Sequence, residues 1–192
     1  MALFSSSNVP SERDSAYKPP GRTLTAMPDK WTSRSTGKQL VDSLGLGRWS
    51  GLSFFGKQGK RLSIMTAYHS PRQQLKGSFD FYDQQYALLL ASGIAKPNVD
   101  TQFVCDIVKF IQALQREGHE IIFSLDHVNE TNGQDKVGIV DLVLREWCQL
   151  YDLHTIGPDD KPPETYYPYG NHHRIDYIYG SRDYSLSQVP CI

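Results

Sequence analysis

With 192 residues, 39% of them hydrophobic and 11% aromatic, the chain can bury a core, which excludes a wholly disordered polypeptide. The formal net charge of −1 is unevenly spread, because residues 1–76 hold 12 Lys and Arg against 4 Asp and Glu, whereas residues 77–192 hold 8 against 17. This asymmetry suits a polyanion-binding surface beside a metal centre, and equally a chance surface composition. The longest apolar stretch, 87–95, is too short to cross a membrane.

The N-terminal part of the chain is rich in Pro, Gly, Ser and Thr. We expect residues 1–47 to be poorly structured, apart from a short extended piece around residues 22–26. Residues 48–56 and 60–68 are then two strand-like runs joined by a loop that contains Gly59, a pattern typical of a β-hairpin. Alternation places Tyr68 at the end of the second strand, where its simplest interpretation is an aromatic side chain with a solvated hydroxyl group.

Three segments have the apolar spacing of helices. They are residues 79–92, 100–117 and 139–150. The second is the clearest, since Asp100 or Thr101 can cap its start and Gly118 follows its end. It leads directly into the apolar run 121–123, which predicts a helix–strand unit. Short strands are expected at 153–156, 165–167 and 174–180.

Polar residues follow the apolar run 121–123 almost at once. Asp126 and Asn129 would therefore lie where a buried strand ends, and many α/β enzymes build their sites at such a place. The alternative is an ordinary turn, in which Asp and Asn bond to nearby backbone amides. In the last expected strand, alternation puts Arg174 and Asp176 on one face. A charged Asp inside a strand is costly unless it has a partner, and a plain Arg–Asp ion pair would supply one.

The three cysteines, Cys105, Cys148 and Cys191, are odd in number and widely spaced. This spacing predicts neither a zinc site nor a disulfide framework. We therefore expect a reducing, intracellular location and no membrane association.

The order of these motifs resembles the metal-dependent endonuclease/exonuclease/phosphatase family. The motifs are Tyr-x-x-Pro from Tyr68, the capped helix, the strand ending in Asp126 and Asn129, Thr165, and the Arg-Ile-Asp-Tyr-Ile strand that contains Asp176. The layout is most similar to the endonuclease domains of retrotransposons. The resemblance implies a layered α/β sandwich, with a partial domain over residues 48–185, a tail over 186–192, and layers incomplete at the N-terminus and the extreme C-terminus.

The resemblance also assigns roles to residues. Tyr68 would contact the scissile phosphate, Asp126 would orient or deprotonate the attacking water, and Asn129 would hold the phosphate. Asp176 would orient a histidine. The cofactor would be Mg²⁺ or Mn²⁺, weakly held here and with ligands that the sequence leaves open, because in-line attack on a phosphodiester needs a hard cation held by carboxylates.

The implied partner is nucleic acid, DNA rather than RNA, with the rest of a retroelement polyprotein, such as a reverse transcriptase, as a second partner. Basic side chains would hold the nucleic acid electrostatically. These residues are Lys57, Lys60, Arg61, Arg72 and Arg174.

Three departures from the family pattern affect the expected activity. No counterpart of the metal-binding Glu precedes Tyr17, and the closing Ser-Asp-His is absent. In addition, Asp-x-Asn has become Asp-His-Val-Asn, which is either one residue too long, as a bulge could absorb, or a gapless register in which His127 takes the Asp position. Loss of one transition-state donor alone typically costs about 3 to 4 kcal/mol. We therefore expect a very poor nuclease that nicks plasmid no faster than its Asp126→Ala variant. The alternative is a non-catalytic remnant that retains nucleic-acid affinity.

Overall fold

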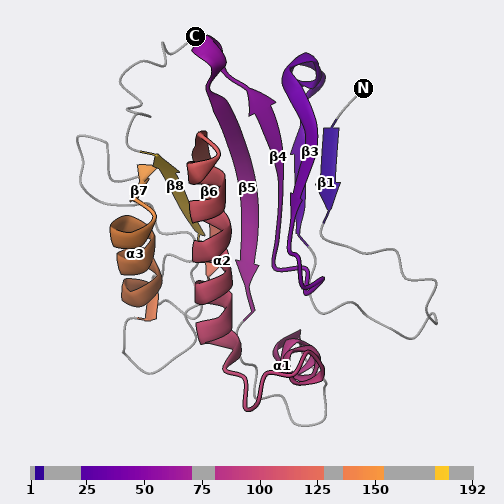
Figure 1. Cartoon of the computed structure of the whole chain (residues 1–192), viewed down its shortest axis with the longest axis vertical. Helices are drawn as coiled ribbons and strands as arrows, with labels where there is room; N and C mark the ends of the chain where they lie inside the picture. Colours follow the sequence, from indigo (N-terminus) through magenta and orange to yellow (C-terminus); the bar gives the residue numbers. More distant parts are fainter. Residues whose placement is uncertain (1–2, 7–22, 71–80, 128–135, 154–175, 182–192) are drawn as a thin grey trace, which may run out of the picture.

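A mixed six-stranded β-sheet forms the centre of the molecule (Figure 1). The computed structural model describes residues 3–6, 23–70, 81–127, 136–153 and 176–181. The strand order is β3-β4-β5-β6-β8-β7. These strands are β3 (Ser35–Val41), β4 (Trp49–Phe55), β5 (Arg61–His69), β6 (His119–His127), β8 (Asp176–Ser181) and β7 (Leu150–Asp152).

The remaining described elements are a second small sheet and several helices. The small sheet pairs β1 (Leu3–Ser6) with β2 (Leu24–Met27). The α-helices are α1 (Phe81–Ala91), α2 (Val99–Arg116) and α3 (Lys136–Trp147), and two short 3₁₀ helices, η1 (Asp29–Arg34) and η2 (Lys57–Gly59), lie in connections. Within the described residues, no helix has the length and apolar character needed to span a membrane.

Strands β5 and β6 are parallel, while the other paired strands of the sheet are antiparallel. A parallel pair requires a long crossover, and α1 and α2 lie in it. Helix α2 begins where the Asn98 side chain accepts a hydrogen bond from the Thr101 amide at 3.0 Å. Asn98 is therefore the N-cap, not Asp100 or Thr101, because its side chain satisfies a donor in the first turn. The chain leaves the helix through Gly118, whose φ of +81° favours glycine.

One face of the sheet is covered by α2 and α3, as Figure 1 shows for α2 in front of β5 and β6. The apolar stripe of α2, represented by Phe103, Ile107 and Ile111, packs against Met65 and Phe123 of the sheet. This is the layered α/β arrangement expected from the sequence, and the hairpin, the Ile121 strand and the last strand all lie in the sheet. The α/β fold class is therefore confirmed.

The opposite face of the sheet is partly covered by β2. The Thr25 hydroxyl, which is buried, donates to the Ser50 carbonyl at 3.0 Å and bonds to the Thr66 hydroxyl at 3.2 Å. On this face Leu62 and Ile64 are half-buried, whereas the alternate residues of β5 are buried under α2. The sheet therefore has two chemically different faces.

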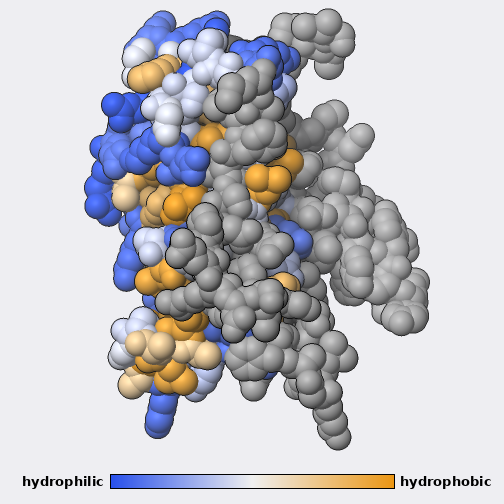
Figure 2. Space-filling view, turned by 90° about the vertical axis from the view of Figure 1, so that its right-hand side faces the viewer, coloured by the Kyte–Doolittle hydropathy of each residue, from blue (hydrophilic) through white to orange (hydrophobic). Residues whose placement is uncertain are grey.

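Two expectations need correction. Residues 1–47 are not uniformly poorly structured, because residues 35–41 form the edge strand β3, which pairs with β4. Helix α1 forms as expected, but its buried residues are Gln85 and Leu89, while Phe81 and Leu88 are 41% and 37% exposed. The spacing identified the helix but only part of its buried face, because the apolar residues of α1 do not gather on one side. Figure 2 shows the result as a mainly hydrophobic surface at the lower end of the molecule, where α1 lies, and a hydrophilic upper end.

Candidate active site

Strand pairing brings three of the expected site residues into one row. Tyr68 of β5 is the register partner of Asp126 of β6, and Asp126 is the register partner of Asp176 of β8. Neighbouring strands lie about 4.8 Å apart, so the row spans roughly 10 Å although its members are far apart in sequence. Three positions that could contact one phosphate thus lie at one end of the sheet. Asn129 lies outside the described residues.

The row belongs to the face of the sheet that turns away from α2. On β5 and β6 the core residues Ala67 and Leu125 are fully buried, and the next positions, Tyr68 and Asp126, are half-buried on the other face. The strand β5 runs down the molecule in Figure 1, so the row lies at the lower end, near the start of α2. Both side chains are therefore partly exposed on this face, although the Oδ1 atom of Asp126 is buried.

An ion network centred on Arg48, which the sequence did not indicate, lies next to the row. Arg48 is 1% exposed and donates to both carboxylate oxygens of Asp42, at 2.7 and 3.0 Å, and to Asp106 at 3.0 Å. Its guanidinium also lies 4.6 Å from the centre of the Trp49 ring. The backbone carbonyl of Arg48 accepts a hydrogen bond from the Tyr68 amide at 2.9 Å. The main chain of Arg48 therefore pairs with the main chain that carries Tyr68. The sequence feature that could have pointed to this network is Arg48 itself, a charged residue at the start of a buried strand.

The residue that follows Tyr68 in β5 is a histidine, and its side chain lies on the other face of the sheet. His69 is 8% exposed, its Nε2 lies 3.1 Å from an Asp100 carboxylate oxygen, and its ring centre lies 4.7 Å from that of Phe103. Position 127 is the register partner of His69, not of Tyr68. The two positions that compete for the family's Asp therefore fall on opposite faces of the sheet.

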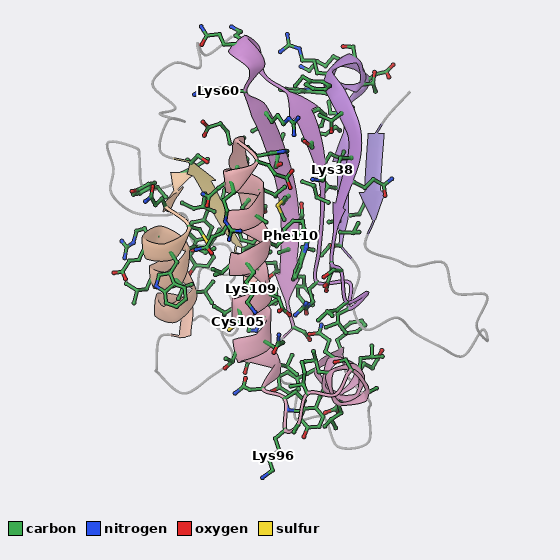
Figure 3. All side chains as sticks on the ribbon, in the orientation of Figure 1. Lys38, Lys60, Lys96, Cys105, Lys109 and Phe110 are labelled. Atoms are coloured by element: carbon green, nitrogen blue, oxygen red, sulfur yellow. The ribbon has the colours of Figure 1, made fainter. Side chains whose placement is uncertain are left out.

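The expected nucleic-acid-binding residues do not surround this row. Lys57, Lys60 and Arg61 lie at the β4–β5 turn, at the opposite end of β5 from Tyr68, and seven strand residues span roughly 23 Å. Figure 3 shows Lys60 at the upper end of the molecule. Lys60 also lies 3.4 Å from Glu120. Lys57, Lys60 and Arg61 therefore do not form a rim beside the row, and their part in nucleic-acid binding stays a prediction. Arg72 and Arg174 lie outside the described residues.

The fit of a metal ion depends on the carboxylates of the row. In the part of the chain that the structure describes, no three His, Cys, Asp or Glu side chains cluster closely enough to hold a metal ion. Mg²⁺ is often held by one or two carboxylates together with water and substrate phosphate. The two acidic positions of the row, Asp126 and Asp176, match that smaller donor set.

A second polar group resembles a catalytic triad but is buried. The Ser63 hydroxyl lies 2.7 Å from His119 Nδ1, and His119 Nε2 lies 3.7 Å from Glu117. Burial lowers the pKa of His119, and the hydrogen bond from Lys38 lowers the pKa of Glu117. Ser63 is 0% exposed, so no substrate can reach its hydroxyl. This arrangement is structural.

The two cysteines among the described residues differ in exposure. Cys105 is exposed and Cys148 is buried, and both are free thiols. Burial raises the pKa of the Cys148 thiol to about 12, which disfavours the nucleophilic thiolate. Neither residue contributes to the row.

Comparison with known proteins gives similarity to solved structures alone. No family model and no curated protein matches the sequence. The catalytic domain of human Nocturnin with a bound sulfate anion matches with a TM-score of 0.46 and 13% identity, over 84% of this chain and 52% of that one. The catalytic domain of Xenopus laevis APE2 matches with a TM-score of 0.40 and 15% identity, over 71% of this chain and 46% of that one. The chain thus spans about half the length of these two domains.

Proposed function

We propose that the row of Tyr68, Asp126 and Asp176 is the phosphate-binding centre of a metal-dependent phosphodiesterase that acts on nucleic acid. The observation that carries the proposal is the pairing of β5, β6 and β8, which aligns a phenol and two carboxylate positions at one end of the sheet. Hydrolysis of a phosphodiester needs these groups, because a nucleophile must be positioned and the developing negative charge must be stabilised.

Each residue of the row has a role that its chemistry allows. The Tyr68 hydroxyl donates a hydrogen bond to a phosphate oxygen, and Asp126 orients the attacking water as its base. Asp126 and Asp176 are the hard oxygen donors that would hold Mg²⁺ or Mn²⁺, and the bound cation would neutralise phosphate charge. Asn129, two residues after β6, is proposed as a further phosphate donor on the strength of the sequence motif.

The strand register supports Asp126 over His127 as the working residue. A shift of one position along a strand moves a side chain to the opposite face of the sheet. Position 126 shares its row with Tyr68, whereas position 127 shares its row with His69, which is buried beside Phe103 of α2. A base at position 126 therefore lies on the same face as the proposed phosphate ligand.

The finer assignments also belong to the proposal. The motif order supports an endonuclease of retrotransposon type that acts on DNA beside a reverse transcriptase. Lys57 and Arg61 are exposed, lie roughly 23 Å from the row and would contact a distant part of the same nucleic acid. Their contribution should therefore be independent of the metal.

Binding of a fluorescently labelled DNA duplex, measured by anisotropy with and without Mg²⁺, tests the proposal. Binding is the primary readout because it does not require a complete catalytic set. In EDTA the Asp126→Asn variant should bind as well as or better than the wild type, since a negative charge near the phosphate is removed. In millimolar Mg²⁺ the wild type should gain about fivefold in affinity, about 1 kcal/mol, and the variant should gain nothing. Nicking of supercoiled plasmid is recorded in parallel.

Two controls separate the site from general electrostatics. Glu146→Gln neutralises an exposed carboxylate on α3 and should keep the full response to Mg²⁺. The Lys57→Ala/Arg61→Ala double variant should lower affinity and reduce the salt dependence by about two phosphate contacts without changing that response. An equal Mg²⁺ response in wild type and Asp126→Asn would refute the proposed site, and salt-dependent binding without any metal response would identify a non-catalytic binding module.

A further inference from the structure

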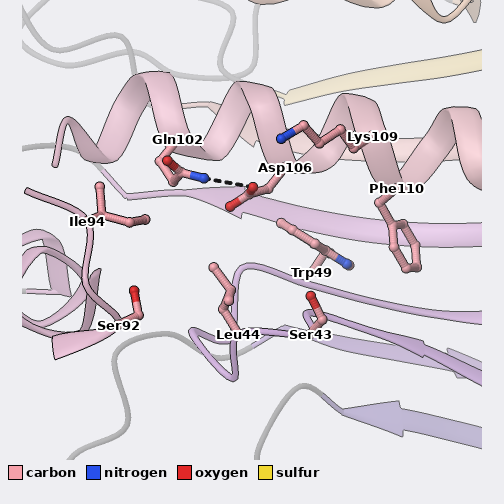
Figure 4. A pocket seen from close by; sticks show the side chains of 9 residues that line it. All are labelled: Ser43, Leu44, Trp49, Ser92, Ile94, Gln102, Asp106, Lys109 and Phe110. Carbon is pink, nitrogen blue, oxygen red and sulfur yellow. Dashed lines mark hydrogen bonds between the residues drawn. The ribbon is translucent and has the colours of Figure 1, made fainter. Parts of the chain in front are cut away.

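A pocket of about 490 Å³ lies on the other side of the sheet from the row (Figure 4). Three segments form its walls: the β3–β4 connection with β4, the α1–α2 connection, and one side of α2. The lining residues are Ser43, Leu44, Trp49, Ser92, Ile94, Gln102, Asp106, Lys109 and Phe110. Its volume is within the range of sites that hold small molecules.

The main feature of this pocket is a buried donor. Trp49 is 1% exposed, and its indole Nε1 has no hydrogen-bond partner among the described residues. Such a group is costly to bury and is normally satisfied. The Phe110 ring centre lies 5.6 Å from that of Trp49, and an N–H contact to a ring would be weaker than a bond to oxygen.

The indole nitrogen lies beside two residues that line the pocket. Figure 4 shows it at the end of the Trp49 side chain nearest Phe110 and Ser43. Ser43 is exposed and Phe110 is half-buried, and both residues line the pocket. The unsatisfied donor therefore adjoins the Ser43 and Phe110 side of the pocket.

The charges around the pocket favour an anion. The Asp106 carboxylate is already used, because it accepts from Arg48 at 3.0 Å and from Gln102 at 2.8 Å. Lys109 is exposed at the rim, and Figure 4 shows its side chain lying along α2 above Asp106. Among the described residues no ion pair forms on Lys109. The pocket thus offers an ammonium group and an N–H donor, whereas its carboxylate is neutralised.

The rest of the lining is apolar. Leu44 is 45% exposed, and Ile94 and Phe110 are half-buried, so all three can contact a hydrophobic body. We propose that this pocket binds a small organic carboxylate with an aromatic body. The carboxylate bonds to Lys109 and the Trp49 N–H, while the ring packs on Leu44, Ile94 and Phe110. A cation would find no free carboxylate here, and a purely apolar ligand would leave both donors unpaired.

Ligand-observed ¹⁹F NMR tests this proposal in the absence of metal and nucleic acid, so its outcome is independent of the proposed hydrolase. The probes are 4-(trifluoromethyl)phenylacetate and its neutral amide, which has nearly the same shape. The wild type should bind the carboxylate about tenfold more tightly than the amide. Lys109→Gln should remove that preference, and Lys96→Gln, which neutralises an exposed lysine outside the pocket, should retain it.

A second measurement reports on the buried donor. The ¹⁵N-labelled chain gives one indole N–H signal for each of its three tryptophans, and Trp49→Phe identifies the signal of Trp49. Addition of the carboxylate should shift this signal downfield and leave the signals of Trp31 and Trp147 in place. Equal binding of carboxylate and amide, the same loss in Lys96→Gln as in Lys109→Gln, no binding, or an unmoved Trp49 signal would each overturn the proposal.

Discussion

Replacement of Arg48 by methionine should destabilise the protein more than any single exposed substitution. The change keeps a long apolar stem but removes the cation that Asp42 and Asp106 share. The Asp42 side chain has 0% exposure, so its carboxylate cannot turn to solvent. A buried charge then remains without its counter-ion.

The magnitude follows from what remains around the two carboxylates. Removal of one partner of a buried ion pair typically costs 3 to 5 kcal/mol. Asp42 retains one donor, the Leu44 amide at 3.1 Å, and Asp106, with 18% exposure, can be hydrated. Loss of the Arg48 contact with the Trp49 ring adds to the cost. We expect a loss of about 3 to 5 kcal/mol, which for a chain of this size lowers Tm by roughly 6 to 20 °C.

Urea unfolding and thermal melting, both followed by circular dichroism, measure this loss. The informative comparison is the Arg48→Met/Asp42→Asn double variant, in which the stranded charge is also removed while the Leu44 amide keeps an acceptor. The double variant should be more stable than Arg48→Met alone. Asp106→Asn should cost about 1 kcal/mol or less, because this side chain is partly solvated. If Arg48→Met lies within about 1 kcal/mol of wild type, or the double variant is no more stable than the single one, the buried network is not a determinant of stability.

Three further predictions follow from buried groups. Burial lowers the pKa of His119, so the stability of the folded chain should fall as pH decreases below about 6.5, because the unfolded chain takes up the proton more readily. In melting curves recorded at several pH values, His119→Gln should reduce this fall. Gly51→Ala should cost about 1 to 3 kcal/mol in urea unfolding, since its Cβ would lie 2.7 Å from the Ile64 carbonyl oxygen; an unchanged midpoint would contradict this contact. In the folded chain Cys148, with a pKa of about 12, should react with iodoacetamide far more slowly than the exposed Cys105, as peptide mass spectrometry can show, and equal rates would mean that Cys148 is not buried.

The parts of the fold with a regular hydrophobic pattern could be predicted from the sequence. The stripe of Phe103, Ile107 and Ile111 indicates α2, and the apolar run at Ile121 indicates β6, because deep burial demands such patterns. Strand β3 escaped prediction, since Ser35–Val41 is polar and interrupted by Gly37, as an edge strand can be. The edge position relaxes the requirement for buried side chains.

The site could be predicted in its residue types but not in its surroundings. Tyr68 and Asp126 follow from alternation at strand ends, yet which strands pair is decided by long-range packing. For the same reason the sequence could not show that Lys60 lies at the other end of β5 from Tyr68. The role of Arg48 depends on Asp42 and Asp106 together, and the second of these is remote in sequence.

The position of β8 in the sheet has a consequence for how the chain folds during synthesis. Strand β7 precedes β8 in the sequence, but β8 lies between β6 and β7, so β7 can join the sheet only after β8 has paired with β6. Until then β6 presents an open edge rich in Ile and Phe, which is a template for pairing with other chains. A nascent or truncated chain that stops before Asp176 would therefore aggregate, and the arrival of β8 closes that edge and completes the row in the same event.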